Sequence, residues 1–202
     1  DIAPVAELLV LCEKYNAWLL LDDAHGFGVL GNEGRGIVSH YALSSPRIIY
    51  MATLGKAAGV SGAFIAGQEV VIETLIQYAR SYIYTTAMPP LLSCALLKSL
   101  ALIKGEGWRR KKLMQLTEHL KKDLKLLRWN LLPSDTPIQP IIIGGNREVM
   151  QVRNALQDKG ILVSAIRPPT VPKNSARLRI SLSATHSIKD VERLVIALRE
   201  LE

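Results

Sequence analysis

The sequence Leu19-Leu20-Leu21-Asp22-Asp23-Ala24-His25-Gly26 joins a short apolar run to a carboxylate and, three residues later, to an imidazole. A continuous apolar run of this length is typical of a strand covered on both faces of a sheet. Because side chains alternate along a strand, Asp22 and Asp23 should point in opposite directions, with Asp22 at a buried strand end. The stretch therefore predicts an α/β fold that presents polar groups where its strands end.

A second apolar run, Ile48–Met51, precedes Thr53-Leu54-Gly55-Lys56-Ala57-Ala58-Gly59. The small neighbours of Lys56 leave room for a planar group beside its amine. A carboxylate, an imidazole and an amine at neighbouring strand ends suit pyridoxal phosphate (PLP), because a lysine amine binds the aldehyde and a carboxylate keeps the ring nitrogen protonated. A lone loop lysine is usually only solvated, so this interpretation depends on the three groups together.

These motifs resemble the α-oxoamine synthase family of fold-type I PLP enzymes. Other matching motifs follow in the family's order: Ser61-Gly62-Ala63, Ile83-Tyr84-Thr85-Thr86-Ala87-Met88-Pro89-Pro90, Ile166-Arg167-Pro168-Pro169-Thr170-Val171-Pro172 and 176–184. The resemblance runs over residues 1–202 but covers only about the C-terminal half of the family's pattern. It implies that residues 1–103 are part of a PLP-binding, aspartate-aminotransferase-like large domain and that residues 104–202 form a small α+β domain.

The resemblance also implies a set of site residues. The catalytic ones are Lys56, Asp22 and His25; the cofactor is bound by these three with Thr53 and Thr86; the substrate is bound by Arg167 and Thr170. In the family, the histidine bonds the phenolic oxygen of PLP, and the second threonine reaches the phosphate held by a neighbouring subunit, which implies a homodimer with a shared active site. A turn histidine at 25 and a strand threonine at 86 are the plain alternatives.

The implied reaction is the condensation of L-alanine with a pimeloyl thioester of coenzyme A or of a carrier protein, with loss of CO2, in biotin biosynthesis. The motif Ile166-Arg167-Pro168-Pro169 favours this branch over the glycine-dependent relatives, 2-amino-3-ketobutyrate CoA ligase and 5-aminolevulinate synthase. An inert fragment is a further alternative. Because the upstream half of the family's pattern is missing, we expect the 202-residue chain to be catalytically inactive alone.

Composition narrows the class of protein. Of the 202 residues, 49% are hydrophobic and 21% are charged, as in an ordinary globular protein. Cys12 and Cys94 lie far apart without metal-ligand spacing, so we expect neither a disulfide framework nor a metal site. No stretch reads as a membrane span or a signal peptide, and we expect a cytoplasmic protein cut from a longer one.

The net charge of +7 is concentrated between Lys104 and Arg128. Leucines recur there at helical spacing, at Leu113, Leu116, Leu120, Leu124 and Leu127. The pattern predicts one long amphipathic helix whose basic face is solvated. The alternatives are a surface that attracts the acyl carrier and, in a different class of protein, a nucleic-acid-binding module. Aromatic residues do not alternate with the basic ones, and we expect no nucleic-acid partner.

One motif is a decoy. Gly26-x-Gly28-x-x-Gly31 follows a strand and matches the dinucleotide-binding fingerprint, but Asn32-Glu33-Gly34-Arg35-Gly36 is a poor helix start and no acidic residue follows at the required distance. Periodicity elsewhere predicts helices and strands in alternation. The helices are expected over 5–14, 69–80, from 89 onward, 147–158 and 188–201; the strands over 18–21, 47–52, 63–66, 138–143, 161–166 and 177–182.

Overall fold

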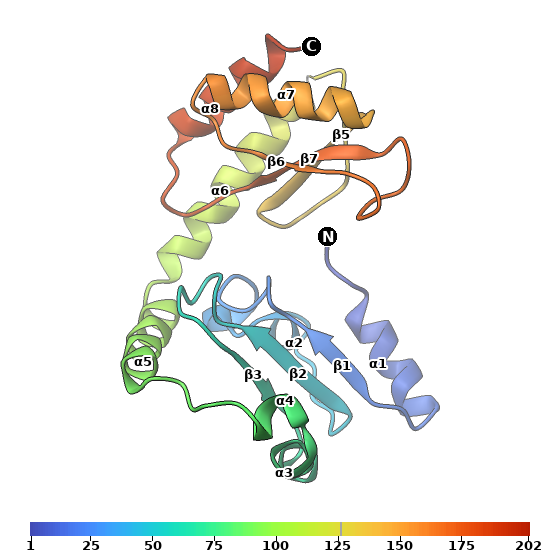
Figure 1. The fold of residues 1–202 in the computed structure, drawn as a ribbon, viewed down its shortest axis with the longest axis vertical. Coiled ribbons are helices and arrows are strands. Elements are labelled where there is room, and N and C mark those ends of the chain that lie inside the picture. Colours follow the sequence, from blue (N-terminus) through green and yellow to red (C-terminus); the bar gives the residue numbers. More distant parts are fainter. Residues whose placement is uncertain (126) are drawn as a thin grey trace. The chain divides into compact units, whose positions relative to one another are not determined.

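The computed structural model describes residues 1–125 and 127–202. They divide into two compact units, residues 3–110 and residues 111–202 together with 1–2 (Figure 1). The division falls inside helix α6 (Gly107–Leu124), a few residues after the boundary predicted at 104. Each unit combines helices with a sheet, whereas the assignment of residues 1–103 and 104–202 to two named domains stays a prediction.

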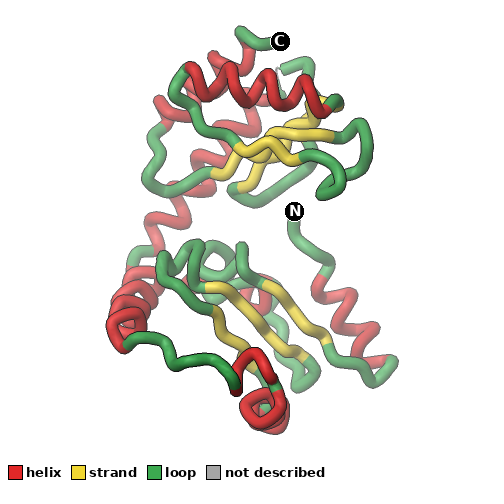
Figure 2. The backbone as a smooth tube through the Cα atoms, in the orientation of Figure 1, coloured by secondary structure: helices red, strands yellow, loops and turns green. Residues whose placement is uncertain are grey.

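The first unit contains a three-stranded sheet in the order β1-β2-β3, which Figure 2 shows in yellow. Its strands are β1 (Leu19–Asp22), β2 (Ile48–Thr53) and β3 (Ala63–Ala66). Strands β1 and β2 run parallel, with Asp22 opposite Met51, and β3 is antiparallel to β2. Because parallel strands end at the same edge of a sheet, Asp22 and Thr53 reach one edge together. The strands lie where the apolar runs predicted them.

The helices of this unit are α1 (Val5–Lys14), η1 (Asn32–Gly34, a 3-10 turn), α2 (Ile37–His40), α3 (Glu69–Tyr78), α4 (Arg80–Ile83) and α5 (Pro90–Gly105). Helix α5 begins with Pro90, a position where the missing N–H costs no helical hydrogen bond. The helix predicted over 69–80 breaks at Ala79, whose backbone is extended, and restarts as α4.

One face of the first sheet departs from the sequence-based expectation. Leu19 and Leu21 are buried, but Leu20 between them is 65% exposed and Ile65 on β3 is 43% exposed. The expectation that this strand is covered on both faces is therefore wrong for the described residues, which cover one face only. A continuous apolar run indicates that both faces of a strand can be buried. It does not reveal which elements, if any, cover those faces.

The second unit contains a four-stranded antiparallel sheet in the order β4-β5-β7-β6. Its strands are β4 (Asn130–Leu131), β5 (Ile138–Gly144), β6 (Ser164–Ile166) and β7 (Ala176–Ser181), and its helices besides α6 are α7 (Asn146–Asp158) and α8 (Ile188–Arg199). Fully buried leucines from α6, α7, β7 and α8 form its core, namely Leu120, Leu156, Leu178 and Leu198. The two-residue strand β4 is too short for periodicity to reveal.

The long amphipathic helix predicted within residues 104–128 is present as α6, which ends four residues before Arg128. Helix α5 ends at Gly105 and α6 begins at Gly107, because two glycines around Glu106 interrupt the helix, and α6 ends at Leu124. Residue 126, inside the predicted span, lies outside the described residues. The apolar stripe is confirmed, since Leu113, Leu116, Leu120 and Leu124 are all buried. None of the described helices combines the length and apolar character that a membrane span requires.

Helix α8 carries a capping box that yields a first prediction. The Ser187 hydroxyl accepts from the Asp190 N–H at 3.3 Å, and the Asp190 carboxylate accepts from the Ser187 N–H at 2.7 Å. We expect Ser187→Ala to lower the free energy of unfolding of this chain by about 1 kcal/mol, because the first turn of α8 loses its cap. Denaturant unfolding measures it. Ser164→Ala, at an exposed strand position, serves as the control; equal effects of both substitutions would contradict the capping role.

Candidate functional site

Asp22 is the last residue of β1, and its side chain is exposed. Its Oδ1 accepts a hydrogen bond from the Ala24 N–H at 3.0 Å, which leads the chain into the turn that carries His25. The expectation that Asp22 is buried is wrong: the side chain lies on the same uncovered face as Leu20. Its neighbour Asp23 points the other way and is buried, as strand alternation predicted.

Lys56 lies three residues beyond Thr53, the last residue of β2, and its Nζ donates to the Thr53 Oγ1 at 3.0 Å. The loop around it, residues 54–62 and hereafter the Lys56 loop, is closed by the Leu54 N–H, which donates to the Gly62 carbonyl at 2.8 Å. The Lys56 side chain is exposed. A Cβ added at Gly55 or at Gly59 would meet nothing within 4 Å, so open space borders this amine, as its small neighbours predicted.

The turn after β1 touches the Lys56 loop. Residues 23–36, hereafter the His25 loop, include Gly28, whose φ is +80°. A Cβ at position 28 would lie 2.6 Å from the Cβ of Ala57, so only glycine permits the two loops to approach this closely. The sequence-predicted groups Asp22, His25, Thr53 and Lys56 are thereby gathered at one edge of the sheet.

Helix α5 supports both loops. The Ser99 Oγ donates to the Ala58 carbonyl of the Lys56 loop at 2.7 Å. A Cβ at Gly34, in the His25 loop, would lie 2.9 Å from the Ile103 Cγ2. One helix therefore contacts both segments that carry the candidate catalytic groups. Sequence reasoning missed these contacts, because nothing in the pattern of α5 distinguishes Ser99 or Ile103 from other residues of the helix.

A buried network at Asp23 was also missed. Asp23 is only 6% exposed, and its Oδ2 accepts from the Tyr50 hydroxyl and from the Ile37 N–H, each at 2.7 Å. Burial, together with the bond to Asp23 and the charge of that carboxylate, raises the pKa of Tyr50 well above its usual value of 10.0. A tyrosine within the otherwise apolar run 48–52 was the one signal available in the sequence.

This shift gives a pH-dependent prediction. An unfolded tyrosine ionises near pH 10.0, whereas folded Tyr50 keeps its proton, so the stability that it contributes is complete below that pH and is lost as the pH rises further. We expect Tyr50→Phe to flatten the alkaline fall in the free energy of unfolding and to lower stability at neutral pH by about 1.5–3 kcal/mol, because a hydrogen bond to a carboxylate is lost. Tyr78→Phe, at a residue 78% exposed, should change neither; an unaltered alkaline slope in Tyr50→Phe would count against the assignment.

The glycines of the decoy fingerprint have structural reasons of their own. A Cβ at Gly26 would lie 2.0 Å from the Asp23 Oδ1, one at Gly28 would meet Ala57, and one at Gly31 would lie 2.5 Å from the Gly36 carbonyl oxygen. No helix of normal length begins at the third glycine, where the short turn η1 follows instead. The three glycines therefore fold the His25 loop against its surroundings.

Thr86 lies in the exposed loop between α4 and α5, not in a strand. Met88 of the same loop packs beside the Lys56 loop, since a Cβ at Gly62 would lie 3.5 Å from its sulfur. Tyr84, two residues before Thr86, is 80% exposed. The segment around Thr86 thus borders the candidate site and presents apolar groups to its surroundings.

Arg167 and Thr170 belong to the other compact unit. Arg167 directly follows β6 and is exposed, and its carbonyl accepts from the Thr170 N–H at 3.0 Å. The guanidinium has no hydrogen-bond or ion-pair partner within the described part of the chain. The arginine is therefore available to an anion, and its role in substrate binding stays a prediction.

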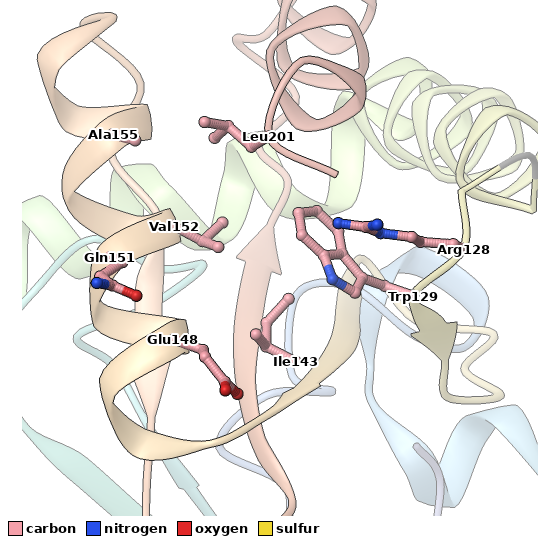
Figure 3. Close-up of a pocket in the computed structure, with 8 residues that line it drawn as sticks. All are labelled: Arg128, Trp129, Ile143, Glu148, Gln151, Val152, Ala155 and Leu201. Carbon is pink, nitrogen blue, oxygen red and sulfur yellow. The ribbon is translucent and has the colours of Figure 1, made fainter.

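A pocket of about 430 Å³ lies in this second unit, between α7 and the end of the chain (Figure 3). Its lining combines apolar side chains, among them Trp129 and Ile143, with the polar and charged side chains of Arg128, Gln151 and Glu148. The Glu148 carboxylate accepts from the Gly145 N–H at 2.9 Å and so caps α7. None of the sequence-predicted site residues lines the pocket.

The donor set at the sheet edge fits PLP. It combines an exposed amine, a carboxylate whose Oδ1 accepts from the N–H of its own turn, a threonine hydroxyl beside the amine and an imidazole in the adjoining turn. His25 has an interaction of its own within the chain. The open space at Gly55 and Gly59 leaves room for a planar ring. The roles of the individual residues toward the cofactor remain proposals.

Comparison with known proteins gives the following relatives. The chain is 69% identical over 202 residues to an 8-amino-7-oxononanoate synthase of Nitrosospira multiformis. The matched region covers 100% of this chain and 51% of that protein. A solved 8-amino-7-oxononanoate synthase from Francisella tularensis is 32% identical with a TM-score of 0.84, over 96% of this chain and 58% of that one. Serine palmitoyltransferase from S. paucimobilis, solved with a bound PLP–myriocin adduct, is 25% identical with a TM-score of 0.92, over 100% and 51%.

The chain spans about half the length of the curated relatives that it matches. The predicted resemblance and the predicted α/β fold class are both confirmed by these similarities. The sequence pattern of the family described as aminotransferase class I and II matches residues 1–198. The chain therefore belongs to the aminotransferase class I and II family.

Proposed function

We propose that this chain supplies the lysine-bearing part of a PLP-dependent acyltransferase that joins L-alanine to a pimeloyl thioester. The products are 8-amino-7-oxononanoate, CO2 and the free thiol of coenzyme A or a carrier protein. The observation that carries the proposal is the position of the Lys56 amine. It donates a hydrogen bond to the Thr53 hydroxyl at 3.0 Å, at the strand ends where Asp22 also lies. The 69% identity to an 8-amino-7-oxononanoate synthase supports alanine and pimeloyl thioester as the substrates.

The residues that would hold PLP are those of the sheet edge. Lys56 would bind the aldehyde carbon, Asp22 would accept a hydrogen bond from the ring N–H, His25 would bond the phenolic oxygen and Thr53 the phosphate. When bound, PLP supplies an electron sink for a carbanion formed next to its point of attachment. The carboxylate of Asp22 keeps that sink effective, because a charged acceptor favours the protonated ring nitrogen.

Lys56 has a second task once alanine is in place. Its amine would take the proton from the alanine Cα, and would return a proton to that carbon after the carbon has joined the thioester carbonyl, the thiol has left and CO2 has been lost. Arg167 holds the alanine carboxylate through a charge-assisted hydrogen bond until that group leaves as CO2. Thr170 lies beside Arg167 in sequence and contacts the substrate.

We also propose that the enzyme is a homodimer in which Thr86 reaches the cofactor phosphate held by the other subunit. The exposed loop that carries Thr86 supports this assignment, since its neighbours Tyr82 and Tyr84 are 61% and 80% exposed. Large exposed aromatic groups of this kind are enriched at protein interfaces.

The experiment joins this chain to the upstream half of the Nitrosospira multiformis relative and assays CO2 release from alanine and pimeloyl-CoA. We expect activity from the joined protein and none from the chain alone. Arg167→Ala should raise the KM for alanine far more than it lowers kcat, with Arg147→Ala, at an exposed position of α7, as the control. Activity with glycine and none with alanine would assign the glycine-dependent branch instead. Release of CO2 by the chain alone would refute the expected inactivity.

A further inference from the structure

We propose that Asp23 is a positioning residue, whose buried carboxylate fixes the His25 loop so that Asp22 and His25 stay directed toward the Lys56 edge of the sheet. The inference rests on the proposed function in one respect only, namely that Asp22 and His25 serve the cofactor. The placement of Asp23 itself depends on contacts within a single compact unit.

The carboxylate of Asp23 joins three elements at one oxygen. Oδ2 accepts from the Tyr50 hydroxyl on β2 and from the Ile37 N–H at the start of α2, both at 2.7 Å. Ile37 follows directly after the His25 loop, so this oxygen ties the end of the loop to its beginning and both of them to the neighbouring strand. Hydrogen bonds to a carboxylate are among the stronger ones in proteins, and these are shielded from water.

The main chain of Asp23 is held as firmly as its side chain. Its N–H donates to the Met51 carbonyl at 2.8 Å, which extends the pairing of β1 with β2 by one residue. Its carbonyl accepts from the N–H groups of Gly26 and Phe27 at 3.1 and 3.0 Å, which closes the turn around His25. Asp22, which precedes this turn, and His25, which lies within it, therefore leave the backbone in fixed directions.

Two glycines make room for the carboxylate. A Cβ at Gly26 would lie 2.0 Å from Oδ1, and a Cβ at Gly36 would lie 2.0 Å from Oδ2. Gly36 also has a φ of +85°, a conformation that other residues rarely adopt. Any side chain at position 26 or 36 would therefore clash with the Asp23 carboxylate, and glycine at both positions lets the loop enclose it. Burying a carboxylate among neutral donors carries a desolvation cost. The hydrogen bonds by which Asp23 holds these segments together offset that cost.

The strand alternation connects this anchor to the site. Because Asp23 is directed inward, Asp22 must be directed outward onto the face where Lys56 and Thr53 lie at the sheet edge. Removing the anchor leaves the Ile37 N–H and the Tyr50 hydroxyl buried without their acceptor, and the loop has to shift to hydrate them. Outer groups that orient direct ligands commonly alter binding by about 10–100-fold when they are removed.

The test compares Asp23→Ala, Asp23→Asn and Tyr50→Phe in this chain, with Tyr78→Phe as the matched control. Three quantities are measured: the free energy of unfolding, the NMR signals of the His25 ring in the folded protein, and the apparent affinity for PLP from its covalent adduct with Lys56. We expect Asp23→Ala to move the His25 signals and to weaken PLP binding by about 10–100-fold. Asp23→Asn retains one acceptor oxygen and should recover most of that loss.

The His25 signals separate positioning from mere stability, because they are read from folded molecules only. Unchanged His25 signals and unchanged PLP affinity in folded Asp23→Ala would overturn the proposal. If that variant does not fold, unchanged His25 signals and unchanged PLP affinity in Tyr50→Phe overturn the proposal. If the unsubstituted chain forms no adduct with PLP, the His25 signals alone decide whether Asp23 positions the loop, and the proposed function is tested separately with the protein joined to its upstream half.

Discussion

Lys56→Ala should abolish the covalent adduct between this chain and PLP altogether. The amine at position 56 has open space at Gly55 and Gly59 and a fixed partner in the Thr53 hydroxyl, and no other group at this edge can bind an aldehyde as a primary amine does. Borohydride reduction of the chain mixed with PLP, followed by peptide mapping by mass spectrometry, should place the label on Lys56 in the unsubstituted protein. In the enzyme joined to its upstream half, the same substitution should lower kcat by at least about 10²–10⁴-fold, because a general base is lost as well.

The control for this experiment is Lys98→Ala. Lys98 lies on helix α5, is exposed like Lys56, and has no hydrogen-bond partner among the described residues. Its substitution should leave the adduct unchanged. Lys56→Arg adds a second control, since it keeps the positive charge and removes the nucleophilic amine. Label that persists in Lys56→Ala, or that is distributed over several lysines, would show that the chain has no specific PLP site.

Gly28→Ala should cost about 2–5 kcal/mol in the free energy of unfolding of the unit 3–110. Two terms add here. The φ of +80° at this residue costs a side chain about 1–2 kcal/mol, and a Cβ placed 2.6 Å from that of Ala57 forces the two loops apart, an overpacking cost of about 1–3 kcal/mol. The separation moves the His25 loop away from the Lys56 loop, so PLP binding should weaken too.

Two other glycines separate these terms. Gly59 has a φ of +65° and open space around it, so Gly59→Ala carries the backbone cost without the clash. Gly55 has open space and no positive φ, and Gly55→Ala should leave stability nearly unchanged. Denaturant unfolding of the three variants therefore gives the order Gly28, Gly59, Gly55. A loss in Gly28→Ala no greater than that in Gly59→Ala would mean that the loops do not need their close contact.

The positions of the strands could be predicted from the sequence because continuous apolar runs bounded by polar residues have few other interpretations. The edge at which Asp22, Thr53 and Lys56 meet followed from the same reasoning, since neighbouring parallel strands end together. Strand alternation also predicted that Asp22 and Asp23 diverge. Each of these inferences depends on local pattern alone, and each agrees with the structure.

Other features depend on contacts between distant residues, which no local pattern reveals. The burial of Asp22 was inferred from its strand, but exposure depends on what covers the strand. The bond from Tyr50 to Asp23 spans 27 residues, and the Ser99 bond to Ala58 spans 41.

The uncovered face of the first sheet has a consequence for how this chain behaves in solution. In the order β1-β2-β3, the outer strands each offer a row of peptide groups without a ladder partner in the described residues, beside the exposed side chains of Leu20 and Ile65. Such an edge is a template on which a further strand from any other molecule can be added, and few charged side chains lie along it to discourage this. Aggregation of the isolated chain should therefore proceed by intermolecular strand pairing and rise with concentration, and Leu20→Lys should slow it.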